Sequence, residues 1–231
     1  MVLPVKPPDS DGPGWELPRG RHRLPRQVVA GHQRERLVLA VAEALAAHGY
    51  ADLTVERVLE IAGVSRTTFY ANFTSKQDAV EAAQEVVFER FLALVLGACS
   101  AQQEWPLKVK AAIGASLDFA AAAPAQAALL DLDALTADRQ IARRGIDNKD
   151  HLASLLATGR RYCERGAELP TLTEQAIVAA LAGAVSTRLI GGEAKRLPEL
   201  APQLVQFALL PYLGQAEAAR VATRPRLGAA P

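Results

Sequence analysis

Two short predicted helices meet at a glycine turn in this chain, and that junction limits the fold more than any other feature of the sequence. Thr54 is a good N-cap for the first helix, whose apolar positions lie on one face. Gly63 suits the left-handed conformation of a tight turn, and Ser65 can cap the second helix directly after it. This pattern is typical of a helix-turn-helix motif, whose second helix enters the major groove of DNA. Taken alone, it also fits an ordinary helical corner.

The second helix of the junction carries hydrogen-bonding side chains with little acid among them, as a helix in the major groove requires. We expect its polar residues to contact DNA: Ser65, Arg66, Thr67, Thr68, Tyr70 and Asn72. Lys76 falls in the first turn of the next helix, where free backbone N–H groups favour a phosphate. A lysine at this position opposes the helix dipole, and a phosphate neighbour would offset that cost.

A longer string around the junction gives the chain a family resemblance. After an amphipathic helix that ends in Gly49-Tyr50, it reads Thr54-x8-Gly63-Val64-Ser65-x2-Thr68-Phe69-Tyr70-x2-Phe73-x2-Lys76. Over roughly residues 34–91, the chain resembles the TetR/AcrR family of bacterial transcriptional regulators. The resemblance implies a homodimer with an N-terminal three-helix DNA-binding domain and a C-terminal helical effector domain. A small molecule bound in the effector domain would change the spacing of the two reading heads and release the operator.

The resemblance also implies roles for single residues. Thr54, Tyr70 and Lys76 would hold phosphates. The residues nearest the base edges would be Arg66, Thr67 and Thr68, and the core of the domain would contain Phe69 and Phe73. Leu59 departs from the pattern, because the position four before Gly63 is usually small. We therefore expect a slightly wider crossing of the two short helices.

The composition favours an all-α fold. Of the 231 residues, 45 are Ala and 31 are Leu, which are both strong helix formers, and only 5% are aromatic. Beyond residue 100 there is no strong strand signal, and prolines and glycines bound five further predicted helices near 106–122, 124–135, 138–165, 174–190 and 198–213. We expect a helix-turn-helix domain over 29–75, a helical effector-binding and dimerisation domain over 76–216, and a flexible tail over 217–231.

Residues 1–28 form an arm rich in Pro, Gly and Arg, and we expect it to be disordered. The stretch 18–36 carries a net charge of +5 in a chain of net charge +1, so the remainder carries −4. Within it, Pro18-Arg19-Gly20-Arg21-His22 is similar to an AT-hook, in which two arginines enter a narrow A·T minor groove. We therefore count Arg19 and Arg21 as candidate DNA contacts. A solvated basic tail that only raises non-specific affinity explains the charge equally well.

A ridge of small residues in the helix predicted near 174–190 suits close helix packing, and we expect it in a dimer interface. The interface candidates are Ala176, Ala180, Ala184, Leu204 and Phe207. An intramolecular core would satisfy the same pattern.

The effector pocket is expected among the helices between residues 100 and 170. Its apolar candidates are Trp105, Phe119, Leu129, Leu155 and Tyr162. Basic candidates for an anionic head group are Arg139, Arg143, Arg144, His151, Arg160 and Arg161. For each of them, a place in the core or on a solvated helix face is the alternative. A lipophilic ligand is what the family resemblance implies.

Several function classes are disfavoured by what the sequence lacks. No run of about 18 clean apolar residues is available to span a membrane, and the first residues do not look like a signal peptide. Four histidines and two cysteines show no metal-ligand spacing, and no catalytic motif is found. We expect a cytoplasmic, non-enzymatic chain without cofactor or metal, whose partners are double-stranded operator DNA, a small-molecule effector and a second copy of itself. The alternatives are a helical small-molecule- or partner-binding protein without specific DNA recognition, and a transcriptional activator of the same family.

Overall fold

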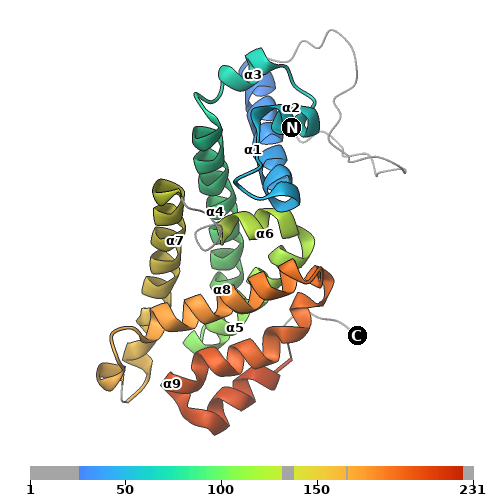
Figure 1. The fold of residues 1–231 in the computed structure, drawn as a ribbon. Coiled ribbons are helices and arrows are strands. Elements are labelled where there is room, and N and C mark those ends of the chain that lie inside the picture. Colours follow the sequence, from blue (N-terminus) through green and yellow to red (C-terminus); the bar gives the residue numbers. More distant parts are fainter. Residues whose placement is uncertain (1–25, 132–137, 165, 226–231) are drawn as a thin grey trace, which may run out of the picture.

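The computed structural model describes residues 26–131, 138–164 and 166–225, which form helices joined by turns, with no strand among them (Figure 1). The α-helices are α1 (Arg26–His48), α2 (Val55–Ala62), α3 (Arg66–Tyr70), α4 (Lys76–Ser100), α5 (Trp105–Ala122), α6 (Pro124–Leu130), α7 (Arg139–Ala157), α8 (Thr173–Ile190) and α9 (Ala201–Thr223). Short 3-10 helices cover Thr158–Tyr162, Gly166–Glu168 and Ala194–Leu200. The all-α fold expected from the sequence is confirmed.

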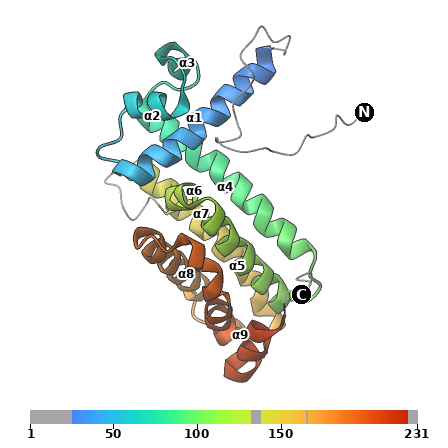
Figure 2. The same ribbon diagram turned by 90° about the vertical axis from the view of Figure 1, so that its right-hand side faces the viewer.

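The molecule has a head at one end and a larger helical body. Helices α1, α2 and α3 make the head, and α4 runs from the head into the body, where α7 lies beside it (Figure 1). Helix α5 lies along α4, and α8 and α9 lie at the end of the body that is remote from α3 (Figure 2).

Side-chain caps define the starts of the short helices in the head. Thr54 Oγ1 caps α2, Ser65 Oγ caps α3 and Ser75 Oγ caps α4, each by accepting a backbone N–H from the first turn at 3.0–3.3 Å. Gly63 closes α2 in the left-handed conformation, with φ 61°. Phe69 then fixes α3 to the rest of the head, since its side chain is fully buried. The glycine turn and the caps at Thr54 and Ser65 are as the sequence predicts.

One buried apolar cluster joins the head to the body. It contains Leu37, Phe69 and Phe73 of the head, together with Leu129 of α6 and Ile141 of α7, all at most 2% exposed. A second cluster fills the body between α5, α8 and α9. Because the first cluster includes residues of α6 and α7, the head is packed directly on two helices of the body.

The helix predicted over 138–165 is broken after Ala157. The main chain at Gly159 lies against Trp105, and a Cβ there would be 1.9 Å from the indole ring. Arg160 then turns its side chain back onto the following loop, and a Cβ at Gly166 would lie 1.8 Å from the carbonyl oxygen of Arg160. Beyond Ala157 the chain continues as the 3-10 helix Thr158–Tyr162, in which Gly159 leaves room for the Trp105 side chain.

The C-terminal helix α9 runs further than expected. It is kinked at Gly214, whose φ of 72° favours glycine, and then continues to Thr223. Residues 217–223, which we expected in a flexible tail, are therefore helical, and Ala218, Val221 and Ala222 are buried. Lys110 Nζ stabilises this end of the helix by donating hydrogen bonds to two of its last carbonyl oxygens at 2.8 and 2.9 Å.

Some expectations fall on parts of the chain that the structure does not describe. The candidate minor-groove residues Arg19 and Arg21 lie outside the described residues, as does most of the arm. Helix α1 begins at Arg26, a few residues before the expected start. Helix α6 ends at Leu130 rather than near residue 135, and residues 132–137 are likewise outside the described ranges.

Candidate functional site

The outer surface of α3 presents part of the predicted DNA-contacting set. Arg66, Thr67 and Tyr70 are exposed, and Tyr70 is 50% exposed. Thr68 and Asn72 are half-buried, because the Thr68 hydroxyl lies 2.9 Å from Ser65 Oγ and Asn72 Nδ2 donates to the Thr68 carbonyl at 2.8 Å. The structure thus brings the six predicted residues of the reading helix together, with three side chains directed outward and the others holding the helix.

Arg66 is held in place by two neighbours. Its Nη2 lies 2.9 Å from Glu56 Oε1 in the first turn of α2, and its guanidinium carbon lies 5.9 Å from the ring centroid of Tyr70. Glu56 was not among the residues predicted for the site, because its contact with Arg66 joins the first turns of two different helices. An acid beside Arg66 limits the net positive charge at this point of the surface.

Lys76 is the first residue of α4, and Thr54 is the N-cap of α2. Lys76 Nζ is 3.4 Å from the Tyr50 carbonyl oxygen and 4.8 Å from the centroid of the Tyr50 ring. The start of α4 also holds an acid, because Asp78 accepts hydrogen bonds from Thr74 N at 2.6 Å and Thr74 Oγ1 at 2.9 Å. These bonds, first that of the Thr74 backbone, lower the pKa of Asp78. Thr54 is exposed at the start of α2.

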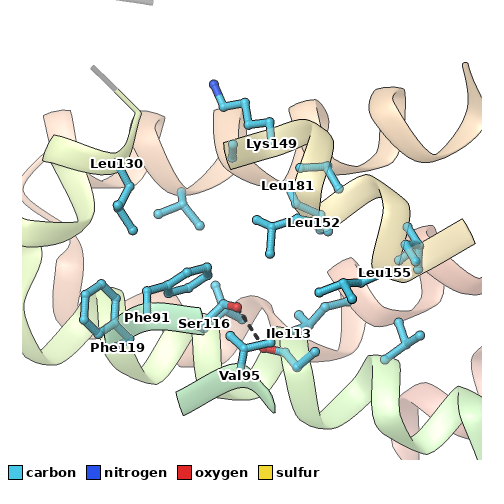
Figure 3. Close-up of a pocket in the computed structure, with 18 of the residues that line it drawn as sticks. Phe91, Val95, Ile113, Ser116, Phe119, Leu130, Lys149, Leu152, Leu155 and Leu181 are labelled. Carbon is cyan, nitrogen blue, oxygen red and sulfur yellow. Dashed lines mark hydrogen bonds between the residues drawn. The ribbon is translucent and has the colours of Figure 1, made fainter. Parts of the chain in front are cut away.

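An apolar cavity of about 390 Å³ lies in the body among α4, α5, α6, α7 and α8 (Figure 3). Aromatic and aliphatic side chains converge on it from opposite sides, among them Phe91, Ile113, Leu130, Leu152 and Leu181. The volume is in the range of small-molecule sites in proteins.

The cavity opens to solvent beside α4 and α7. Leu96 of α4 and Leu155 of α7 both line it and are 45% and 37% exposed, so they mark its mouth. Ser116 is one of its few polar residues, and its hydroxyl donates to the Ala112 carbonyl at 2.8 Å (Figure 3). Its hydrogen-bonding capacity as a donor is therefore used within α5.

A small polar cluster stands at one side of the cavity. Lys149 Nζ of α7 lies 2.5 Å from Asp131 Oδ1 at the end of α6, and the Ser186 hydroxyl of α8 donates to the other oxygen of Asp131. All three residues line the cavity, and both charged side chains are at most one quarter exposed. The cluster ties three helices together and sets a cation and an anion beside an otherwise apolar space.

The structure corrects half of the predicted pocket. Trp105, Phe119 and Leu155 line the cavity as expected, whereas Leu129 belongs to the cluster that joins the head to the body and Leu130 lines the cavity. His151 is exposed on α7, with its ring 6.0 Å from that of Phe88. Tyr162 is 62% exposed and stacks on Trp105. None of the five candidate arginines lines the cavity. Arg160 forms an ion pair with Glu174, and Arg144 forms one with Glu85. The other three are exposed: Arg139, Arg143 and Arg161.

The small-residue ridge of α8 lies on the surface of the chain. Ala176 and Ala180 are exposed and Ala184 is half-buried. On α9, Phe207 is 47% exposed, whereas Leu204 lines the cavity instead. Further large apolar side chains are exposed on or beside these two helices: Leu172, Ile190 and Leu210.

The described part of the chain contains no group of three or more His, Cys, Asp or Glu residues placed to hold a metal ion. No single described helix is long and apolar enough to cross a membrane, and the bent pair α5 and α6, at 119° to each other, reaches that length and composition only when taken together.

Comparisons with known proteins point to one family. The profile of the tetR family of bacterial regulatory proteins matches residues 38–83, which contain the helix-turn-helix. The fatty acid degradation regulator FadR from Bacillus halodurans is similar in structure, with 22% identity and a TM-score of 0.67 over 77% of this chain and 94% of that one. A TetR-like transcriptional regulator from Rhodococcus sp. RHA1 has 18% identity and a TM-score of 0.64 over 81% and 98%. FadR from Bacillus subtilis in complex with stearoyl-CoA has 17% identity and a TM-score of 0.64 over 78% and 98%. No curated protein sequence gives a significant match.

Proposed function

Because this chain belongs to the TetR family of bacterial regulatory proteins, we propose that it is a ligand-responsive transcriptional repressor in the cytoplasm. A homodimer binds a palindromic operator with the two α3 helices, and a small molecule in the body cavity releases it. The observation that carries this proposal is the combination of a capped, acid-poor reading helix at one end with an apolar cavity of about 390 Å³ in the same chain. Neither the reading helix nor the cavity alone would indicate DNA binding that is controlled by a ligand.

The DNA-binding part of the proposal depends on Arg66 for base reading and on Lys76 for phosphate. Replacing Lys76 by Ala should weaken binding to all duplexes alike and reduce the slope of log affinity against log salt by about 1. Replacing Arg66 by Ala should relax the preference at one base position at a cost of about 1–3 kcal/mol. Binding is measured by fluorescence anisotropy over a range of salt concentrations.

Lys195→Ala is the matched control, because it removes the same charge from an exposed position remote from α3. If Lys195→Ala changes the salt slope as much as Lys76→Ala, the head is not the DNA-binding surface.

We further propose a ligand with a long aliphatic chain and an anionic head group. The almost entirely apolar lining supports the aliphatic chain, and Lys149 at one side is the cation that an anionic head group would bind in exchange for Asp131. The similar FadR structure from Bacillus subtilis is a complex with stearoyl-CoA, which makes that compound a suitable first probe.

Trp105 offers a direct readout of ligand binding, since it is 6% exposed and lines the cavity. In a Trp15→Phe background, Trp105 is the sole tryptophan of the chain. Adding stearoyl-CoA should change its fluorescence in a saturable way, and Ser116→Phe, which fills part of the cavity, should abolish the change. An unaltered titration of Ser116→Phe would place the acyl chain outside this cavity.

A further inference from the structure

One helix of the body reaches both the cavity and the head. The C-terminal half of α7 lines the cavity with Lys149, Leu152 and Leu155 (Figure 3). The residue that caps its N-terminal end lies against the head, where the Tyr50 hydroxyl donates a hydrogen bond to Asp138 Oδ2 at 3.1 Å. A packed helix moves as a rigid element, so a displacement beside the cavity is transmitted to this contact.

Asp138 uses its two carboxylate oxygens for two different elements. Oδ1 accepts hydrogen bonds from Gln140 N at 3.0 Å and Ile141 N at 3.3 Å and thereby caps α7, while Oδ2 accepts the Tyr50 hydroxyl. Burial, and then the hydrogen bond to Asp138, raises the pKa of Tyr50 to about 12, so the hydroxyl keeps its proton at neutral pH. The start of α7 is therefore fixed to the turn between α1 and α2.

Tyr50 in turn contacts the lysine that we assign to phosphate binding. The Nζ atom of Lys76 lies 3.4 Å from the Tyr50 carbonyl oxygen and 4.8 Å from the centroid of the Tyr50 ring. These two contacts restrict a long and otherwise flexible side chain at the start of α4. Restricting it before DNA arrives lowers the entropy that is lost on binding.

A row of polar contacts continues the seam between α4 and α7 away from Tyr50. Gln140 Nε2 donates to Glu81 Oε2 at 2.8 Å, and one turn further Arg144 Nη1 lies 3.3 Å from Glu85 Oε2. Both contacts are exposed, so each contributes little to stability. A seam of this kind holds α7 in place and yet allows it to shift along α4.

We propose that Asp138 is a positioning residue for DNA binding: it holds Tyr50, which places Lys76, so that the position of α7 sets how well the head binds phosphate. This inference rests on the proposed function and adds to it the residues that carry the signal from the cavity. Asp138 and Lys76 are thereby coupled, although they belong to different helices and do not need to touch.

The test is a double-mutant cycle on duplex affinity without ligand, with the full-length chain and the duplex selected from a random pool. Asp138→Ser keeps a capping oxygen for α7 but is too short to serve Tyr50 as well. Asp138→Ser and Lys76→Ala should each weaken binding. The double variant should bind the duplex at least about 3-fold more tightly than expected from multiplying the two single effects. Tyr50→Phe, which removes only the hydroxyl, should give the same coupling, and Tyr162→Phe is the matched control.

Two outcomes separate this inference from the proposed function. If the wild type binds duplex and Lys76→Ala weakens it, but the effects of Asp138→Ser and Lys76→Ala simply multiply, the positioning role is refuted while DNA binding stands. If the wild type shows no salt-dependent duplex binding, the proposed function fails first.

A second experiment measures the duplex affinity with and without stearoyl-CoA. The ratio of the affinity without stearoyl-CoA to the affinity with it should be at least about 5-fold smaller in Tyr50→Phe than in the wild type. An unchanged ratio contradicts the signal route, whereas a purely structural role of Tyr50 would lower thermal stability and leave the ratio as it is.

Discussion

Replacing Glu174 by Ala should lower the free energy of unfolding by about 3 kcal/mol, which corresponds to roughly 6–12 °C in Tm. Glu174 is only 5% exposed, and its carboxylate binds Arg160 through two hydrogen bonds of 2.9 and 2.8 Å. It also accepts the hydroxyl of the buried Tyr212 at 2.7 Å. Removing the carboxylate leaves the buried Tyr212 hydroxyl without its acceptor and takes away the counter-ion of Arg160, which keeps only carbonyl acceptors. Arg160 would also lose the partner that orients its side chain toward the loop, where it donates to the Leu169 carbonyl at 2.8 Å.

The same carboxylate should make the free energy of unfolding depend on pH. Burial acts to raise the pKa of Glu174, but the hydrogen bonds from Arg160 and Tyr212 outweigh it and lower the pKa below the ordinary value of 4.5. A lowered pKa in the folded state means that this stabilisation is present above pH 4.5 and is lost as the pH falls through the folded value. Urea unfolding of the wild type and of Glu174→Gln should therefore differ most near neutral pH and converge in acid. A constant difference from pH 3 to pH 7 would contradict an ionised Glu174 in the folded protein.

Replacing Ala180 by Arg should weaken operator binding by about 10²–10⁴-fold and yield a monomer of 24.6 kDa in sedimentation. Ala180 is exposed in the small-residue ridge of α8, and large apolar side chains on or beside α8 and α9 are exposed as well. A second copy would cover these side chains, and an arginine in a close helix contact would separate the two copies. Each reading head alone would then bind one half-site without the gain of simultaneous contact.

Gln175→Arg is the matched control for the dimer. Gln175 is on the same helix, but its amide donates to Asp150 of α7, so it lies on another face. This variant should remain dimeric and bind the operator as the wild type does. If Ala180→Arg remained dimeric and kept full operator affinity, the dimer interface would not be formed by α8.

The head could be predicted almost completely from the sequence, because its structure is set by local rules. Thr54 and Ser65 accept the N–H groups that any helix start leaves unpaired, and Gly63 takes the backbone conformation that other residues avoid. Each of these effects acts within four residues. Of the predicted body helices, α5 and α8 agree with the structure within one residue at each end, whereas α6 and α7 end earlier than predicted and α9 ends later.

The cavity could be predicted only in part, because its lining depends on which neighbour each helix face meets. Leu129 and Leu130 are adjacent and chemically identical, yet Leu129 is buried in the cluster that joins the head to the body and Leu130 lines the cavity. Just after Ala157, Gly159 packs against Trp105, which lies far away in the sequence, so a local pattern cannot predict this contact. Tyr50 and Asp138 are 88 residues apart in the sequence, so no local pattern predicts their contact.

Selection of duplexes from a random pool by the full-length chain tests the central claim most directly. We predict that the recovered sequences contain two inverted half-sites with one fixed spacing, that the Ala180→Arg variant no longer retains them, and that stearoyl-CoA elutes them from the wild type. A bound pool with the same composition as the input, or recovered sites that consist of single, non-symmetric elements, would contradict a dimeric operator-binding regulator.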